Sequence, residues 1–525
     1  MRTVRCLALL AMAMVGGCSL APPYARPAPL VSPPGGWKTA EGWRPANPDG
    51  GGVRGDWWTG FADRTLDELV ARADANNQTV AQAAAAYRQA AAATREARAS
   101  LFPTVSANGS VTHSYSGSGR VITGDVVGTS TGSSAGTGTG TTGSGTTTGT
   151  TTGSTTTGLV SNGRSSTSYR LSLQASWQPD FFGRVLNTTR NARYTQEARL
   201  ADLANARLTV QGELVSDYLS LRAADAQIAS LSATVAAFDR SLRIATNRYD
   251  AGVVARTDQF QAQSQLASAQ SELEGQKRTR AQFEDAIAVL VGENPAGFRI
   301  VSLPDWRPAQ PDVPDTVPSA LVERRPDIAS AERQVAAANA QVGVQRAAFF
   351  PTVSLSGSGG VQNDALTGLF SAGSLLWSLG GQVAETLLDF GARSARVAQA
   401  RAAYDATVAN YRGVTLTAFQ EVQDNLIAQE ILARQEALLR TASVAADRSE
   451  AALSNQYKAG IVIYTDVVTA QTTALNARRA LIQAQLDRQN ATVALVQALG
   501  GGWSDAELAN GAEAARAAAV ASRPR

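Results

Sequence analysis

The chain has 525 residues, 44% of them hydrophobic, which is enough to bury a large core, and its formal net charge is only +3. So small a charge gives no indication of a nucleic-acid partner. One histidine, His113, and two cysteines, Cys6 and Cys18, argue against a His/Cys metal site and against a disulfide framework. No phosphate-binding loop or nucleophile motif stands out, so we expect a protein that is not an enzyme and has no cofactor.

Residues 1–17 are typical of a signal peptide. Arg2 and Arg5 precede an apolar stretch at 7–15 that is too short to cross a bilayer as a mature helix. The stretch runs into Val15-Gly-Gly-Cys18, which resembles a bacterial lipobox. We therefore expect lipidation of Cys18, where several acyl chains would give a stable membrane anchor. The alternative is an ordinary signal peptide that happens to end near a cysteine.

The next two segments differ in composition. Residues 18–60 are rich in proline, glycine and tryptophan and lack periodicity, so we expect an extended strap on the body of the protein. Residues 63–100 are rich in alanine, and apolar residues such as Leu66 and Leu69 recur at helical spacing. This pattern predicts a helix that ends before Pro103.

Four stretches then alternate between apolar and small polar residues, and they contain Val105, Tyr169, Val353 and Leu375. A period of two residues predicts β-strands. Long strands with one apolar face and one small polar face are typical of a transmembrane β-barrel. A soluble sandwich with one wet face is the alternative, and the export signal favours the membrane.

Residues 117–165 lie between the first two of these strands and contain a long run of threonine, glycine and serine. Such a composition cannot bury a core. Pro103 aligns with Pro351 at an offset of 248 residues, whereas the offset elsewhere is 208, so the first half carries an insertion of 40 residues here. We expect a long exposed loop, which in such barrels faces the outside of the cell.

Two long helical hairpins are predicted, and they are copies of each other. Arg248-Tyr-Asp-Ala-Gly252 at the first turn matches Gln456-Tyr-Lys-Ala-Gly460 at the second, with an offset of 460 − 252 = 208. Apolar residues of the first limb fall near a spacing of 3.5, which indicates a left-handed coiled coil. The core of a helical bundle is compatible with the same spacing. The predicted limbs are 184–249 and 257–291 in the first hairpin, and 393–457 and 465–499 in the second.

The predicted organisation therefore contains two repeats, each with a helix, two strands and a long helical hairpin. In chain order we expect a signal peptide at 1–17, a lipidated strap at 18–60, a first repeat at 61–303, a proline-rich linker at 304–318, a second repeat at 319–503 and a tail at 504–525.

Several motifs together resemble the signature of TolC/NodT-type outer-membrane efflux factors. They are Leu321-Val-Glu-Arg-Arg-Pro-Asp327, Ala331-Glu332 and Ala347-Ala-Phe-Phe-Pro-Thr-Val353. Cys18-Ser-Leu-Ala-Pro-Pro-Tyr24, and Trp177 followed by Asp180-Phe-Phe-Gly-Arg184, support the resemblance. Only the threonine/glycine insertion and the tail fall outside it.

The resemblance implies an α+β membrane protein with a TolC-like fold. Four transmembrane strands per chain would contribute to a homotrimeric β-barrel in the outer membrane, and the coiled-coil helices would form an α-barrel in the periplasm. Four strands cannot close a barrel alone, and an open edge in lipid leaves backbone groups unpaired. Three copies would supply about twelve strands.

The resemblance also implies a function. The chain would be the passive exit duct of a tripartite efflux pump for drugs or other small toxic solutes, and so a determinant of multidrug resistance. Its partners would be a periplasmic membrane-fusion adaptor and an inner-membrane RND-type pump. An exit duct for type I protein secretion is one alternative, and a structural or adhesive surface lipoprotein is another.

Finally, the resemblance implies a periplasmic gate at the hairpin turns. In the family, a tyrosine at the turn and acidic residues at the start of the return helix close the channel. Tyr457 matches the tyrosine, and Thr257 and Asp258 match its partners. Asp466 matches a lumen-facing acid, and Thr469 stands where relatives often carry Asp. A Tyr–Asp hydrogen bond would contribute about 1.5–3 kcal/mol. The alternative is that both acids cap their helices.

Overall fold

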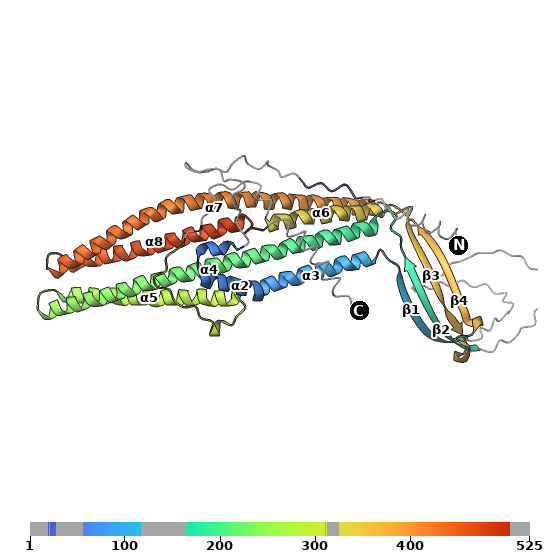
Figure 1. Cartoon of the computed structure of the whole chain (residues 1–525), viewed down its shortest axis with the longest axis horizontal. Coiled ribbons are helices and arrows are strands. Elements are labelled where there is room, and N and C mark those ends of the chain that lie inside the picture. Colours follow the sequence, from blue (N-terminus) through green and yellow to red (C-terminus); the bar gives the residue numbers. More distant parts are fainter. Residues whose placement is uncertain are drawn as a thin grey trace, which may run out of the picture. The chain divides into compact units, whose positions relative to one another are not determined.

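The structure is a computed structural model that describes residues 19, 21–27, 56–116, 164–309, 311 and 325–503. Cys18, the predicted signal peptide, the threonine/glycine run and the predicted tail lie outside these residues. The chain divides into two compact units, shown in Figure 1. The helical unit takes its chain from 1–101, 180–351 and 385–525, and the sheet unit from 102–179 and 352–384. Each unit therefore draws on both repeats.

The helices and strands follow the order expected for two repeats. The helices are α2 (Arg64–Asn76), α3 (Gln78–Ala99), α4 (Arg184–Asp250), α5 (Arg256–Leu290), α6 (Pro326–Ala347), α7 (Ala392–Lys458) and α8 (Tyr464–Ala498). The strands are β1 (Thr104–Ser116), β2 (Arg164–Trp177), β3 (Thr352–Asn363) and β4 (Leu375–Ala384), and the short 3-10 turns are η1 (Trp57–Phe61), η2 (Pro295–Gly297), η4 (Leu366–Gly368) and η5 (Ala372–Ser374).

The two hairpins are equal in length. Helices α4 and α7 have 67 residues each, and α5 and α8 have 35 each. Both ends of the long helices differ by 208 residues (392 − 184 and 458 − 250), which confirms the repeat. A helix of this length extends about 100 Å. Within the described residues, no helix combines the length and hydropathy needed to cross a bilayer.

The predicted helix at 63–100 is two helices, because Asn77 interrupts it. The backbone of Asn77 is extended, and its side chain accepts hydrogen bonds from the amides of Thr79 and Val80, so it caps the start of α3. Its amide group also donates to the carbonyl of Leu290, at 2.9 Å. This hydrogen bond to the end of α5 fixes the position of the break between α2 and α3. The alanine-rich sequence gives no indication of the break.

The largest apolar core of the helical unit lies where η1 and α2 meet α4, α5 and α8. Leu66, Leu214 and Ile287 are fully buried there. Trp57 and Trp58 join the same core from η1, so the end of the predicted strap is a packed turn. The long helices are thereby held together near the middle of the unit, where α2 and α3 meet (Figure 1).

The other described residues of the strap, 19 and 21–27, precede this turn in the chain and contact α4 and α6. The Ser19 hydroxyl donates to the side-chain oxygen of Asn187 at 3.0 Å. The Tyr24 hydroxyl donates to the Glu332 carboxylate at 2.5 Å, and burial together with this bond raises the pKa of Tyr24. The segment that directly follows Cys18 is therefore fixed to the helices by side-chain bonds.

The sheet unit is one antiparallel sheet with the strand order β1-β2-β3-β4. Its register places odd-numbered residues of neighbouring strands on one face and even-numbered residues on the other. The odd face carries exposed apolar side chains such as Val105, Trp377 and Leu379, and the even face is mostly serine, threonine, glycine and glutamine. Strand β2 begins at Arg164, so the loop predicted at 117–165 is two residues shorter at that end.

Candidate functional site at the hairpin turns

The two hairpins reverse with the same backbone geometry. Gly252 and Gly460 have φ angles of 72° and 77°, a left-handed conformation that favours glycine after a helix end. The amide of Val253 donates to the carbonyl of Arg248 at 2.8 Å, and at the equivalent position the amide of Ile461 donates to Gln456 at 2.9 Å. The duplicated sequence at the turns thus encodes a duplicated C-cap.

The two turns lie at the same end of the helical unit, as Figure 1 shows, and they share a small core. The first hairpin contributes Ala245 and Ala262 to this core. The second contributes Tyr457 and Tyr464, whose ring centroids are 5.4 Å apart. The turns therefore pack against each other within one chain.

Arg248 joins the first turn to the second. Its guanidinium lies over the ring of Tyr457, 4.8 Å from the centroid, and Nη1 donates to the Tyr457 carbonyl at 3.0 Å. A cation over an aromatic face contributes about 0.5–2 kcal/mol, depending on how far it is desolvated. Arg248 was not among the residues predicted from sequence.

The Tyr457–Asp258 hydrogen bond expected from the sequence is absent in the described part of the chain. The hydroxyls of both Tyr457 and Tyr464 are buried, and neither has a hydrogen-bond partner there. Burial raises the pKa of Tyr457, the Arg248 charge opposes this, and the Asp258 charge adds to it. Burial, Tyr457 and Asp258 raise the pKa of Tyr464 to about 12. Asp258 therefore acts on the two tyrosines through its charge.

The other predicted gate residues lie on the surface of the chain. Thr257, Asp466 and Thr469 are exposed, and the Thr469 hydroxyl donates to the carbonyl one helical turn earlier. The N-caps of α5 and α8 are Ala255 and Ile463, and neither Asp258 nor Asp466 accepts a hydrogen bond from described residues. The capping alternative is therefore not supported. Both acids still lie in a first helical turn, where the helix dipole favours negative charge.

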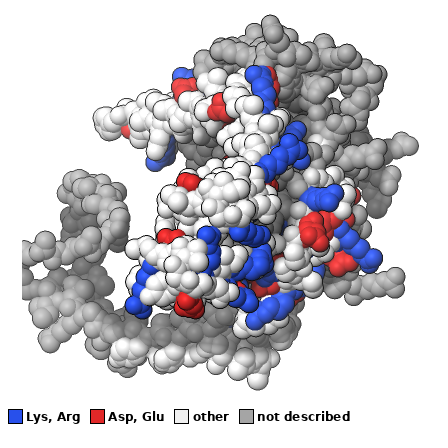
Figure 2. All heavy atoms as spheres, turned by 90° about the vertical axis from the view of Figure 1, so that its left-hand side faces the viewer, with Lys and Arg blue, Asp and Glu red and all other residues white. Residues whose placement is uncertain are grey.

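The residues missed at this site occupy positions at which the two repeats differ. Arg248 corresponds to Gln456, and Tyr464 corresponds to Arg256. Figure 2 looks onto the end that carries the turns, and lysine and arginine side chains cover more of it than aspartate and glutamate do. A difference between two largely similar turns was the available signal for both residues.

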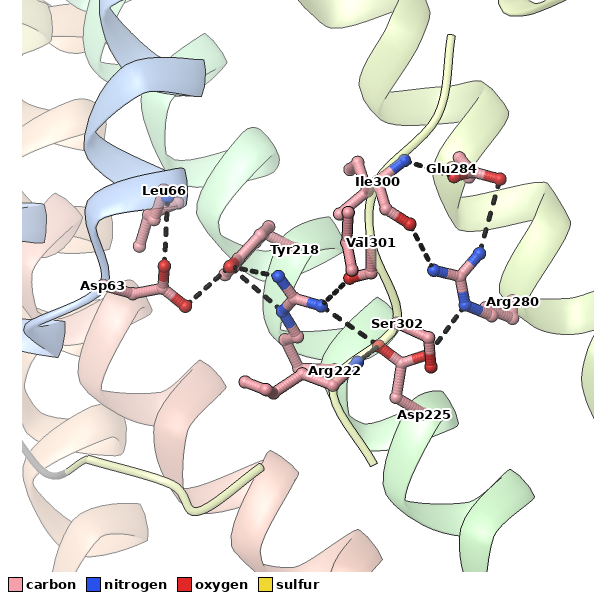
Figure 3. Close-up of polar contacts among 11 residues, drawn as sticks. Asp63, Leu66, Tyr218, Arg222, Asp225, Arg280, Glu284, Ile300, Val301 and Ser302 are labelled. Carbon is pink, nitrogen blue, oxygen red and sulfur yellow. Dashed lines mark hydrogen bonds and ion pairs between the residues drawn. The ribbon is translucent and has the colours of Figure 1, made fainter. Parts of the chain in front are cut away.

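A second polar cluster is buried between α4, α5 and the segment after η2 (Figure 3). Asp225 is at its centre and is 1% exposed. Its carboxylate accepts from Arg280 at 2.7 Å and from Arg222 at 3.1 Å. It also accepts from the Ser302 hydroxyl at 2.7 Å and from the Leu303 amide at 3.0 Å. Four donors from three segments therefore depend on one carboxylate.

The cluster extends from Arg222 toward the start of α2. Arg222 donates to the Val301 carbonyl at 2.7 Å and to the Tyr218 hydroxyl at 2.8 and 3.0 Å. The Tyr218 hydroxyl donates to Asp63 at 2.6 Å, and Asp63 caps α2. Figure 3 shows this chain of contacts running from Asp63 to Arg280. It ties the start of α2 and the segment at 300–303 to the first hairpin.

Burial and hydrogen bonding compete at these groups. Burial alone would raise the pKa of Asp225, but the bonds from Arg280, Leu303 and Ser302 more than offset it and hold the pKa below its usual value. Burial and the bond to Asp63 raise the pKa of Tyr218. At neutral pH the network therefore contains an ionised aspartate and a neutral tyrosine.

The described part of the second repeat lacks this arrangement. Arg280 corresponds to Arg488, which pairs with Glu436 of α7 at 2.9 Å, and Asp225 corresponds to Ala433. The buried network therefore belongs to the first repeat alone. Two charged residues, Arg222 and Asp225, lie within the apolar run around Leu221, and this departure from the apolar pattern was the signal for a buried polar network.

Comparisons with known proteins agree with this architecture. The outer membrane efflux protein family matches residues 69–293 and 317–501. Outer membrane protein OprJ of Pseudomonas aeruginosa is 30% identical over 503 residues, which cover 95% of this chain and 96% of OprJ. The solvent efflux pump outer membrane protein SrpC of Pseudomonas putida is 29% identical over 511 residues, which cover 95% of this chain and 98% of SrpC.

A solved structure of the outer-membrane channel OprN superposes with a TM-score of 0.76 at 26% identity, covering 93% of this chain and all of OprN. These matches confirm the TolC-like fold, the outer-membrane location and the efflux role expected from the resemblance. The matched segments include both hairpins and all four strands. The chain belongs to the outer membrane efflux protein family.

Proposed function

We propose that three copies of this outer membrane efflux protein form a passive exit duct. The observation that carries the proposal is the four-stranded sheet, which has one apolar face, one small polar face and two edge strands, β1 and β4. Unpaired backbone groups at such edges are costly in lipid, and pairing between copies removes the cost. The apolar face then meets lipid, and the small polar face lines the pore.

The duct serves a tripartite pump, with a periplasmic membrane-fusion adaptor and an inner-membrane RND-type pump as its partners. Support comes from relatives that are named as outer membrane proteins of efflux pumps, among them SrpC with its solvent pump. We extend this role to small toxic solutes and drugs as cargo. The hairpin turns, which end both long limbs, are the part that an adaptor would reach.

We propose further that the turns form the gate. Tyr457 and Tyr464 each bury a hydroxyl without a partner among the described residues, and such a group costs about 1–3 kcal/mol until it is satisfied. Because both hydroxyls are enclosed by their own chain, a partner could reach them only if the turns rearranged where three pairs of them converge. A polar rim at the turns is completed by Thr257, Asp258, Asp466 and Thr469. In the trimer, a ring of three Asp466 side chains would attract cations through direct charge interaction.

Expression of the chain should restore efflux to a strain that lacks it. We expect the deletion strain to be sensitive to organic solvents and drugs, and the complemented strain to regain resistance. The purified protein should have about three times the 54.7 kDa chain mass and conduct ions in a planar bilayer. A protein that stays monomeric and never conducts would contradict the proposal.

Cys18→Ser should abolish acylation without preventing insertion. We propose that Cys18 carries the lipid, because the lipobox-like sequence precedes it and the following segment is bonded to the helices at Ser19 and Tyr24. Metabolic labelling with palmitate should mark the wild type and not the variant. The variant should still reach the outer membrane, because its strands are buried there independently. A wild-type N-terminus that is unacylated and cleaved elsewhere would refute this assignment.

A further inference from the structure

The even face of the sheet is uncharged along nearly all of its length. Among the strand residues whose side chains the structure describes, Arg170 is the only lysine, arginine, aspartate or glutamate. It lies at the middle of β2, opposite Ser110 of β1 and Gln362 of β3. The single histidine, His113, lies on the odd face. Among the described side chains of the even face, one permanent positive charge therefore stands in a field of small polar residues.

Arg170 is exposed, and it has no ion-pair or hydrogen-bond partner in the described part of the chain. Its neighbours along the same face of β2 are Ser168 and Ser172, which offer no charge. Asp364, just after β3, is the nearest acid in the register, and no ion pair joins it to Arg170. The guanidinium thus keeps its five donors for a group from outside the sheet.

We propose that three Arg170 side chains form an anion-binding ring in the lumen of the assembled barrel, a site for anionic groups on solutes that pass through it. This rests on the proposed trimeric duct, in which the even face lines the pore. Rings of arginine are a known means of selecting anions in pores. Guanidinium is suited to carboxylate, sulfonate and phosphate oxygens, because its donors can engage two of them at once.

The size of the barrel decides how strong the ring can be. Twelve strands about 4.8 Å apart and tilted by about 40° make a ring roughly 24 Å across. Arginines that reach inward would hold their charges within about one Debye length, about 8 Å at physiological ionic strength, of a solute on the axis. The ring therefore acts on ions throughout the lumen at low salt and weakens as salt rises.

The test is block of the pore by a polyanion. Purified full-length protein is reconstituted in planar bilayers, and myo-inositol hexakisphosphate is added to each side in turn. We expect block of the wild type from one side, and at least tenfold weaker block of Arg170→Gln. The difference should shrink when potassium chloride is raised from about 0.1 M to 1 M, because screening shortens the reach of the charges.

Two variants serve as controls. Arg170→Lys keeps the charge and should retain most of the block, whereas Asp364→Asn removes the nearest acid and should leave the block equal or tighter. Equal block of Arg170→Gln and the wild type, in channels of equal conductance, would overturn the ring while leaving the duct in place. Failure of every protein, wild type included, to conduct would overturn the proposed duct and the ring with it.

Discussion

Asp225→Ala should destabilise the helical unit by about 3–5 kcal/mol, the range for removing one partner of a buried ion pair. The loss is large because the Arg222 guanidinium would stay buried without a carboxylate, and Arg280 would keep only Glu284, at 3.4 Å. The Ser302 hydroxyl and the Leu303 amide would lose their acceptor as well. A lower melting temperature of the purified protein and earlier unfolding in denaturant would measure the effect.

Asp239→Ala is a matched control for this substitution. Asp239 lies on the same helix and pairs with Arg243 at i,i+4, but both side chains are largely exposed. Exposed pairs of this kind contribute about 0.3–0.5 kcal/mol, so the control should melt close to the wild type. Equal melting of the Asp225 and Asp239 variants would show that the buried network does not stabilise the fold.

The pH dependence has a definite sign. The pKa of Asp225 lies below its usual value in the folded chain, so its ionised form is bound more tightly in the folded than in the unfolded state. Its stabilising contribution is fully present above the unfolded pKa and is lost as the pH falls through the folded pKa. The gap between wild type and Asp225→Ala should therefore narrow under acidic conditions.

The long helices could be predicted almost to the residue, and the reason is local. Their limbs contain no proline, their apolar spacing is regular, and each turn is marked by a glycine, Gly252 or Gly460, in a left-handed conformation. The strands could be predicted equally well, because the alternation of apolar and small polar residues occurs in both halves of the chain. The break at Asn77 was not, since the cap depends partly on a bond to Leu290, more than 200 residues away.

The candidate site was only partly accessible from sequence for the same reason. Motif resemblance found Tyr457 and Asp258, and the charge of Asp258 raises the pKa of Tyr457. The bond from Arg248 to Tyr457 joins residues 209 positions apart, so no local spacing contains it. The network around Asp225 likewise needs the segment at 300–303 to return to the first hairpin. Contacts between segments far apart in the chain require the packed structure.

Arg248→Ala should raise the open probability of the channel by about tenfold or more. In each chain Arg248 is the residue that bonds the first turn to the second, through the Tyr457 ring and its carbonyl. A cation over a ring and a charged hydrogen bond, both partly buried, together contribute about 2 kcal/mol. A loss of about 1.4 kcal/mol changes an equilibrium tenfold, and three chains lose it together. If closure needs the two turns of each chain to stay paired, the closed state should become much less populated.

Single-channel recording at low voltage measures this, and Arg256→Ala provides the matched control. Arg256 is an arginine at the same turn that lies over Tyr249 and Phe260, both within the first hairpin, so its removal leaves the pairing of the turns intact. It should conduct like the wild type. Tyr457→Phe keeps the ring and the carbonyl that Arg248 contacts and removes a hydroxyl that has no partner among the described residues. A large opening effect of Tyr457→Phe would mean that this hydroxyl has a partner in the closed channel that the described part of the single chain does not provide. If Arg248→Ala and Arg256→Ala conduct equally, the contact between turns does not hold the channel closed, and closure depends on contacts between chains instead.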